Sequence, residues 1–244
     1  MTIHRKKIFI TGASGGIGSV ICKKFLDYEC SLILTSSSDE KLEKLKSVYG
    51  KDHFYYKLNL SKIDELSKSM EIISKEHKDI NILINNAGTN DDSLLLRMKY
   101  SQWSKVMDTN LNSSFIIIKS ILPSMIANKS GKIIGISSVV ASTGNPGQAN
   151  YTSSKAGMVA MYKSIAREVA RRNINVNIIS PGFIISPMTD KLNETQKTNI
   201  LEAIPMNKFG KPSDVASLVA FLSSEESAYI TGQNFHINGG MLMV

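Results

Sequence analysis

Cysteine is scarce in this sequence, and neither cysteine stands in a recognisable motif. Cys22 falls within an expected helix and Cys30 lies near the strand that follows it. Two thiols of this kind indicate a reducing compartment more than a disulfide framework. The 4 histidines also lack the spacing of metal ligands. We therefore expect no metal ion and assign the histidines structural or surface roles.

Long apolar runs are absent too. Among the longest is 115–118, which is interrupted by Lys119 and falls far short of the ~20 residues that a membrane-spanning helix needs. Residues 1–7 are polar and basic, and the first strand is expected directly after them, which leaves no room for a secretory signal. We expect a soluble cytoplasmic protein with no membrane partner. The matrix of an organelle is the alternative, because a removed targeting peptide would leave no trace.

Acidic residues are outnumbered, with 21 Asp and Glu against 29 Lys and Arg and a formal net charge of +8. Such an excess predicts an acidic partner. Nucleic acid is not expected, because the sequence has no basic stripe interleaved with aromatic residues, no helix-turn-helix and no zinc spacing. Linkers, internal repeats and low-complexity segments are absent as well. We therefore expect one domain over residues 1–244.

Short apolar segments alternate with helical periodicity, which is typical of a parallel sheet covered on both faces. The expected fold class is α/β, a Rossmann-type doubly wound, mostly parallel seven-stranded sheet in a single domain. Ligands of such folds bind beyond the carboxyl ends of the strands. Strands are expected at residues 7–11, 31–36, 54–57, 80–85, 131–137, 175–179 and 234–237.

Residues 183–207 show weak periodicity and precede the last helix, which is expected to begin near Pro212. This segment follows the sixth expected strand, at the edge where ligands bind. We therefore interpret it as a substrate lid. An ordinary surface excursion is the alternative.

A glycine-rich segment follows the first strand. Residues 8–10 are apolar and lead into Gly12, Gly16 and Gly18, after which a helical pattern begins. Glycines between a strand and a helix let the backbone approach a pyrophosphate, which the helix N-terminus attracts through its free N–H groups and dipole. The spacing is longer than the Gly-x-Gly-x-x-Gly form.

Tyr151 and Lys155 are four residues apart in an expected helix, and Ser138 lies thirteen residues before the tyrosine. Helical neighbours at this spacing share a face. A nearby ammonium favours a phenolate, so we expect Lys155 to lower the pKa of Tyr151 from its ordinary value near ~10. Taken alone, the spacing is more often a solvated helix surface.

Together these motifs resemble the short-chain dehydrogenase/reductase family. The glycine run, Asn-Asn-Ala-Gly at 85–88, Asn110, Ser138, Tyr151, Lys155 and Pro181-Gly182 occur in the family's order over essentially the whole chain. More narrowly, the chain resembles the 3-oxoacyl-(acyl-carrier-protein) reductases of type II fatty-acid synthesis. Segments 144–151, 181–184, 228–232 and 238–241 carry this narrower resemblance.

The resemblance implies NADPH-dependent reduction of a 3-oxoacyl thioester to a 3-hydroxyacyl thioester in fatty-acid elongation, a step of lipid metabolism. Tyr151 would protonate the carbonyl oxygen and Ser138 would donate a hydrogen bond to it. Lys155 would also bind the nicotinamide ribose. Asn110 resembles an asparagine whose local backbone distortion holds a water that connects the lysine to solvent. Ser137 competes with Ser138, but strand alternation would direct it to the other face.

The resemblance also assigns residues to the cofactor. Asn86, Ala87 and Gly88 are expected against its adenosine side, Asn59 near the adenine, and the Ser186 hydroxyl near the nicotinamide carboxamide. The expected cofactor contacts are Gly12, Ser14, Gly16, Ile17, Gly18, Ser37, Asn59, Leu60, Asn86, Ala87, Gly88, Tyr151, Lys155, Pro181, Gly182, Ile184 and Ser186.

The choice between the two dinucleotides depends on the end of the second strand. An acidic residue there would bind the ribose 2′-hydroxyl and repel a 2′-phosphate. Residues 34–38 read Leu-Thr-Ser-Ser-Ser, which favours NADP over NAD. Asp39 follows closely, and Gly15 stands where NADP-using relatives often have arginine. Ser37 and Glu40 also have capping-box spacing, so Ser37 is alternatively a helix cap.

An acyl carrier protein that bears the 3-oxoacyl thioester is the expected acidic partner. The resemblance implies that Lys129 and Arg172 dock it, although Arg172 and its basic neighbours would also complement the negative end of their helix. The apolar tail 241–244 and the family's assembly through its last elements predict a homotetramer.

Two other functions stay open at this stage. One keeps the chemistry and changes the substrate to acetoacetyl-coenzyme A, a sugar or another small ketone. The other is a non-catalytic dinucleotide-binding scaffold, since fold does not fix function. The presence of Asn110, Ser138, Tyr151 and Lys155 together argues against the scaffold.

Overall fold

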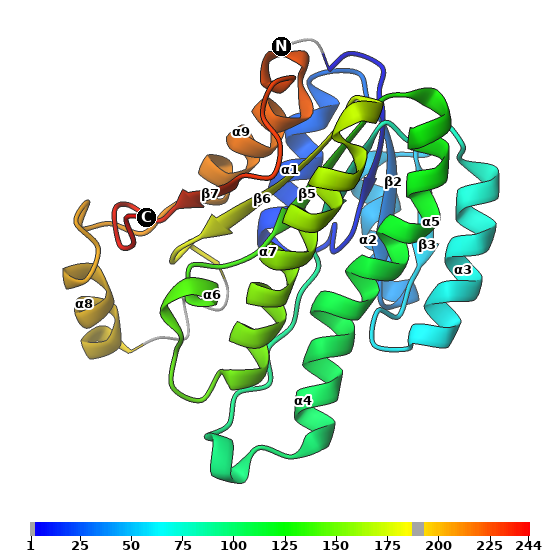
Figure 1. Cartoon of the computed structure of the whole chain (residues 1–244). Coiled ribbons are helices and arrows are strands. Elements are labelled where there is room, and N and C mark those ends of the chain that lie inside the picture. Colours follow the sequence, from blue (N-terminus) through cyan, green and yellow to red (C-terminus); the bar gives the residue numbers. More distant parts are fainter. Residues whose placement is uncertain (1–2, 187–192) are drawn as a thin grey trace.

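One parallel seven-stranded sheet organises the molecule. The computed structural model describes residues 3–186 and 193–244, and within them the strand order is β3-β2-β1-β4-β5-β6-β7. Figure 1 shows the helices wrapped around this sheet. All six neighbouring strand pairs are parallel. The strands are β1 Lys7–Ile10, β2 Ser31–Ser36, β3 Phe54–Lys57, β4 Ile82–Asn85, β5 Gly131–Ile136, β6 Ile174–Pro181 and β7 Asn234–Ile237.

The predicted fold class is confirmed, and every predicted strand is present. Predicted and observed strand ends differ by at most two residues, as where β4 begins at Ile82 rather than at residue 80. The described sheet is wholly rather than mostly parallel.

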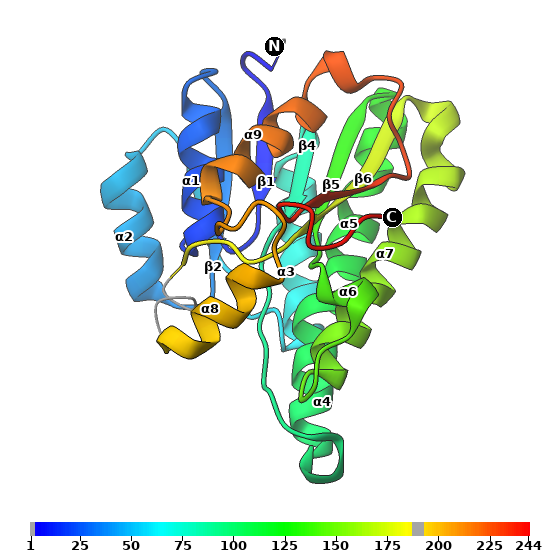
Figure 2. The ribbon, with the colours of Figure 1, turned by 90° about the vertical axis from the view of Figure 1, so that its left-hand side faces the viewer.

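Two layers of helices cover the sheet. Helices α1, α2 and α9 lie on one face, whereas α3, α5 and α7 lie on the other, as Figure 2 shows from a second direction. The helices are α1 Gly16–Leu26, α2 Asp39–Tyr49, α3 Ile63–Glu76, α4 Tyr100–Met107, α5 Ser113–Asn128, α6 Val140–Thr143, α7 Ala149–Val169, α8 Glu194–Glu202 and α9 Pro212–Ser223.

Strand alternation divides the core between the two layers. On β1, Ile8 and Ile10 contact the layer that contains α1, whereas Phe9 contacts the layer that contains α5. All three side chains are 0% exposed. This burial on both faces explains why the strand reads as a continuous apolar run and not as an alternation of polar and apolar residues.

The carboxyl ends of the strands meet at one edge, and the predicted cofactor and catalytic residues follow them there. Gly12 comes after β1, Ser37 after β2, Asn59 after β3, Asn86 after β4 and Ser138 after β5. Parallel pairing brings these ends together.

The predicted lid, residues 183–207, is only partly described, because 187–192 lie outside the described residues. Ile184 forms an isolated parallel bridge with Gly210. The lid also contains α8, which was not predicted. Helix α8 begins after Asn193, whose side chain accepts a hydrogen bond from the backbone N–H of Gln196. The role of this segment as a lid stays a prediction.

Candidate active site

The glycine loop after β1 is held against the end of β4. The Thr11 hydroxyl oxygen accepts 3.0 Å hydrogen bonds from the backbone N–H groups of Asn86 and Ala87. The Asn86 amide donates to the carbonyl oxygens of Thr11 and Gly12 at 3.0 and 3.1 Å. These bonds fix the loop beside the sheet edge.

Two glycines of the loop leave no room for a side chain. Gly12 has a φ of +66°, and a Cβ there would lie 2.8 Å from the Cα of Ala87. A Cβ on Gly18 would lie 2.2 Å from the carbonyl oxygen of Gly12. Helix α1 has no side-chain cap, so its first N–H groups are available to an anion.

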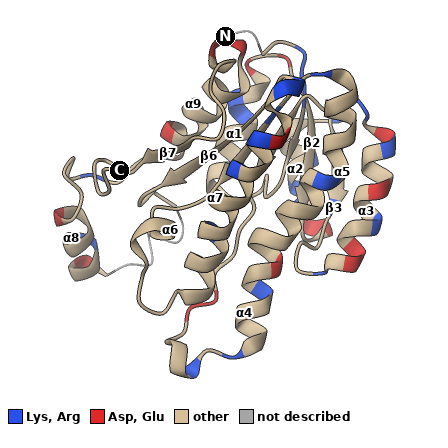
Figure 3. Ribbon diagram, viewed as in Figure 1, with Lys and Arg blue, Asp and Glu red and all other residues tan. Residues whose placement is uncertain are grey.

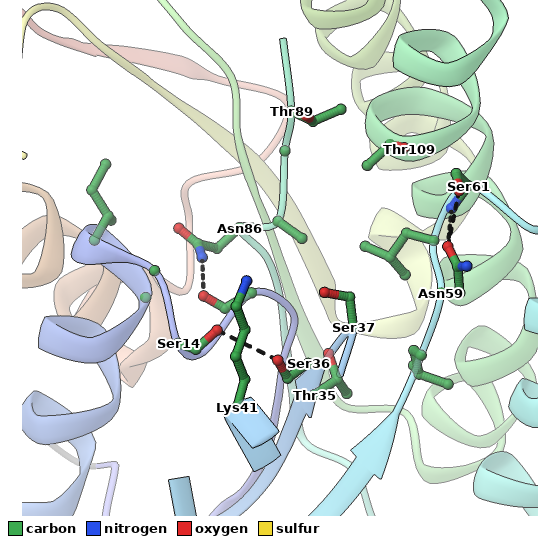
Figure 4. A pocket seen from close by; sticks show the side chains of 18 of the residues that line it. Ser14, Thr35, Ser36, Ser37, Lys41, Asn59, Ser61, Asn86, Thr89 and Thr109 are labelled. Carbon is green, nitrogen blue, oxygen red and sulfur yellow. Dashed lines mark hydrogen bonds between the residues drawn. The ribbon is translucent and has the colours of Figure 1, made fainter. Parts of the chain in front are cut away.

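A cleft of about 730 Å³ lies over this loop, and Figure 4 shows Ser14, Ser37 and Asn59 among the side chains that line it. Its floor of glycines at a helix N-terminus and its polar walls fit a dinucleotide with its phosphates at α1. The predicted cofactor residues that line the cleft are Gly12, Ser14, Gly16, Ile17, Gly18, Ser37, Asn59, Leu60, Asn86, Ala87, Gly88 and Ser186.

A second pocket of about 340 Å³ continues the cleft. The two cavities share the lining residues Ile17, Asn86, Gly88, Thr89 and Ser186. A dinucleotide in the cleft can therefore extend into the pocket. The remaining predicted residues that line this pocket are Ser138, Tyr151, Lys155, Pro181, Gly182 and Ile184.

Tyr151 and Ser138 meet in the second pocket. Burial raises the pKa of Tyr151, and the nearby Ser138 hydroxyl opposes this effect only in part. The phenol is therefore protonated at neutral pH. The neighbouring Ser137 is directed elsewhere, because its hydroxyl donates to the carbonyl oxygen of Lys155 at 3.1 Å. The structure thus brings Ser138, and not Ser137, to Tyr151.

Lys155 lies beneath Tyr151 and is 3% exposed. Its Nζ atom donates a 2.7 Å hydrogen bond to the carbonyl oxygen of Ile136 and lies 5.8 Å from the centre of the Tyr151 ring. Burial lowers the pKa of Lys155 to about 8. The expected pKa of Tyr151 below its ordinary value is not found, because burial outweighs other effects on the phenol and also disfavours the Lys155 ammonium.

Asn110 lies behind the pocket wall. The expected backbone distortion is present as a π-helix over Asp108–Asn112. The Asn110 side chain is 1% exposed, and its oxygen accepts from the backbone N–H of Thr89 at 2.8 Å. Its amide donates to the Thr89 carbonyl and to the Ser154 hydroxyl, both at 2.9 Å. Such π-helical turns are frequent at functional sites.

Gly88 separates Asn110 from Lys155. A Cβ on Gly88 would lie 3.1 Å from the Nζ atom of Lys155 and 3.5 Å from the side-chain oxygen of Asn110. The missing side chain therefore lets the backbone of residue 88 pass close to both polar groups.

Thr89 and Lys41 are among the site residues that sequence reasoning missed. Thr89 lines both cavities and holds the Asn110 amide through its backbone. Its place directly after the Asn-Ala-Gly run was an available signal. Lys41 also lines the cleft, but its position within a lysine-rich helix gave no signal.

The predicted docking residues lie far from the pocket within one chain. Lys129 follows α5 and lies two residues before β5, and Arg172 lies two residues before β6. Gly131 and Ile174, the first residues of those strands, are paired in the sheet. Both basic residues therefore lie at the amino edge, opposite Tyr151. Figure 3 shows Lys and Arg residues gathered at this edge, around the C-terminal end of α7.

Residues 3–186 and 193–244 contain neither a metal-binding cluster nor a membrane-spanning helix. No group of three or more His, Cys, Asp and Glu side chains could hold a metal ion there. No helix in the same residues combines the length and apolar character that a bilayer span requires.

Comparison with known proteins gives full-length matches. A family model described as "Enoyl-(Acyl carrier protein) reductase" matches residues 12–242. A 3-oxoacyl-[acyl-carrier-protein] reductase FabG of Rickettsia felis is 48% identical over 98% of both chains. Proteins of the same name from Buchnera aphidicola subsp. Acyrthosiphon pisum and Vibrio cholerae are 44% and 41% identical over 100% of both chains.

These matches agree with the architecture and the site geometry. They span the glycine loop, the catalytic pocket and the last strand. The chain belongs to the short-chain dehydrogenase/reductase family and is an NAD(P)-dependent oxidoreductase.

Proposed function

We propose that this protein reduces 3-oxoacyl-(acyl-carrier-protein) to 3-hydroxyacyl-(acyl-carrier-protein) with NADPH, the ketone-reducing step of fatty-acid elongation. The observation that carries the proposal is the half-buried Tyr151 phenol, which lines the same pocket as the Ser138 hydroxyl, in continuation of the dinucleotide cleft. The names of the full-length relatives support the choice of substrate.

The dinucleotide, when bound, supplies the hydride that adds to the ketone carbon. Tyr151 and Ser138 direct their hydroxyl groups to the carbonyl oxygen, on which negative charge develops. Ser138 donates a hydrogen bond to that oxygen, and Tyr151 transfers its proton to it. The raised pKa of Tyr151 suits this direction of reaction, because the acid must hold its proton until the oxygen becomes basic.

Lys155 then stabilises the phenolate that Tyr151 has become. Its pKa of about 8 allows the ammonium to pass a proton back to the phenolate near neutral pH. A water held between Lys155 and the side-chain oxygen of Asn110, which both lie close to Gly88, would return the proton to Lys155. Asn110 thus acts by positioning this water.

NADPH is proposed over NADH because the cleft does not repel a 2′-phosphate. Strand β2 ends at Ser36 and is followed by Ser37. Among the described residues, the lining of the cleft includes no Asp or Glu. A carboxylate at this place would accept the ribose 2′-hydroxyl and exclude the phosphate.

A homotetramer is proposed from two apolar surfaces. Helices α5 and α7 border a groove that includes Phe115, Leu122 and Met161, and Phe115 is 51% exposed. Met243 and Val244 of the tail are 78% and 92% exposed. Contiguous apolar surface of this kind marks a subunit interface.

Docking of the carrier at Lys129 and Arg172 is proposed together with the tetramer. A strand of six residues spans about 20 Å, and both residues lie at the edge opposite the pocket. They would therefore serve the pocket of a neighbouring subunit.

Two buried free thiols, Cys22 and Cys30, support the cytoplasm as the proposed compartment.

The test of this function compares substrates at equal concentration with the purified protein. Acetoacetyl-acyl carrier protein should give a higher kcat/KM than acetoacetyl-coenzyme A, and both should exceed a free small ketone. A crotonyl thioester, the substrate of enoyl reduction, should not be turned over. A free ketone as the best substrate would contradict the carrier-protein proposal, and turnover of the crotonyl thioester alone would contradict ketone reduction.

A further inference from the structure

Lys41 lies in the dinucleotide cleft but has no role in the proposed function. It stands in the first turn of α2 and lines the cleft together with Ser36 and Ser37. Figure 4 shows its side chain reaching into the cleft. The Ser38 hydroxyl caps α2 by accepting from the Lys41 backbone N–H at 3.4 Å. Ser38, and not Ser37, is therefore the cap, which leaves the Ser37 hydroxyl available to a ligand.

Each acidic residue next to Lys41 is paired with a different lysine. Asp39 is 2.6 Å from the Nζ atom of Lys57, and Glu40 is 2.7 Å from that of Lys44. Lys57 reaches Asp39 because it pairs with Ser36 in the β2–β3 register. Of the ion pairs formed by the described residues, none includes Lys41.

Only one other cation lines the same cleft within the described residues. Lys105 belongs to α4 and is 3.1 Å from the carboxylate of Asp91. The charge of Lys105 is thus already matched. Lys41 is the cation at the β2 side of the cleft, where Ser36 and Ser37 stand and where the adenosine ribose of a dinucleotide lies in folds of this type.

We propose that Lys41 binds the 2′-phosphate of NADPH, and that the Asp39–Lys57 ion pair keeps the nearest carboxylate from repelling that phosphate. This inference rests on the NADPH part of the proposed function. An ammonium and a phosphate form a charge-assisted contact, and the Ser37 hydroxyl is placed to donate to the same phosphate. Gly15, in the glycine loop, has no cationic side chain that could bind the phosphate. The residues that distinguish NADPH from NADH therefore lie on α2 and β3.

The first experiment measures the binding of NADPH and NADH by calorimetry, without any acyl substrate. Lys41→Gln should raise the Kd of NADPH about five- to tenfold, which corresponds to the loss of one charge-assisted contact. The Kd of NADH should change by less than about twofold. Lys44→Gln is the matched control, because Lys44 lies on the same helix but pairs with Glu40 and is not among the cleft-lining residues.

The outcomes separate this inference from the proposed function. If the wild-type protein prefers NADPH and Lys41→Gln retains that preference, the assignment of Lys41 is overturned while the function stands. Equal weakening of both cofactors also overturns it. A wild-type protein with no preference for NADPH contradicts the cofactor proposal and this inference together.

A second experiment tests the ion pair. Lys57→Gln should release the Asp39 carboxylate and raise the Kd of NADPH about two- to threefold, with the Kd of NADH unchanged. Adding Asp39→Asn to that variant should restore the wild-type Kd of NADPH. If the double variant binds NADPH no better than Lys57→Gln, the proposed role of the pair is wrong.

Discussion

The ammonium group of Lys155 donates a 2.7 Å hydrogen bond to the backbone carbonyl oxygen of Ile136. This bond joins α7 to the end of β5, so the protein itself fixes the lysine in place. The same burial that fixes it lowers its pKa to about 8. The burial of Lys155 between α7 and β5 therefore sets both the position of its ammonium group and its pKa.

Burial of Lys155 predicts a pH-dependent stability. The folded pKa of about 8 lies below the ordinary value of 10.5, so between these values the unfolded chain binds more protons and stability rises with pH. Relative to Lys155→Met, the wild-type free energy of unfolding should increase from pH 8 to pH 10.5 by on the order of 3 kcal/mol. Urea unfolding of both proteins at several pH values measures this. A constant difference would contradict the lowered pKa.

Gly88→Ala tests the proposed water between Lys155 and Asn110. The added Cβ would lie 3.1 Å from the Lys155 Nζ atom and would crowd such a water. Turnover should fall about tenfold or more, because return of the proton to Tyr151 becomes slow. Steady-state kcat and the binding of NADPH should be measured together. A loss confined to NADPH binding would show that Gly88 serves only the cofactor.

Gly18→Ala should destabilise the protein. Its Cβ would lie 2.2 Å from the backbone oxygen of Gly12, which cannot move without disturbing the loop, and overpacking of this kind costs about 1–3 kcal/mol. Gly15→Ala is the matched control, since its Cβ would lie at an ordinary 3.4 Å from the same oxygen. Thermal or urea unfolding compares the two variants. Equal stability would contradict the close approach at Gly18.

Phe115→Glu should disrupt the proposed tetramer. The side chain is 51% exposed in the groove between α5 and α7, and a carboxylate cannot be buried there without a partner. Light scattering should give a tetramer for the wild-type protein and a smaller species for the variant. Ile72→Glu is the control, because Ile72 is 58% exposed on α3, away from the groove. A monomeric wild-type protein would reject the proposal.

The sequence was sufficient for the central strands β1, β4 and β5 because they are short apolar runs buried on both faces. Residues 8–10 are fully buried and are followed by Thr11 and Gly12, so their type, and their boundary to within one residue, could be predicted. Helix α8 was missed because none of its residues is buried, and hence it has no apolar stripe. The Asn193 and Gln196 capping pair was the one available signal.

Site residues that belong to motifs after strand ends could be predicted from the sequence. Interactions between residues far apart in the sequence could not. Ser138 was chosen by its distance from Tyr151 along the chain, and the structure brings the two together. The predicted lowering of the Tyr151 pKa was wrong, because the four-residue spacing to Lys155 does not show how far the phenol is buried. The Asp39–Lys57 pair depends on the β2–β3 register, which no local pattern reveals.

Tyr151→Phe tests the central claim most directly, because it removes one hydroxyl and keeps the ring. The measurement is turnover of acetoacetyl-acyl carrier protein with NADPH, together with the Kd of NADPH, for the wild-type protein and the variant. We expect kcat to fall about 10²- to 10⁴-fold and the Kd of NADPH to stay within about twofold. Undiminished turnover in the variant would contradict Tyr151 as the proton donor.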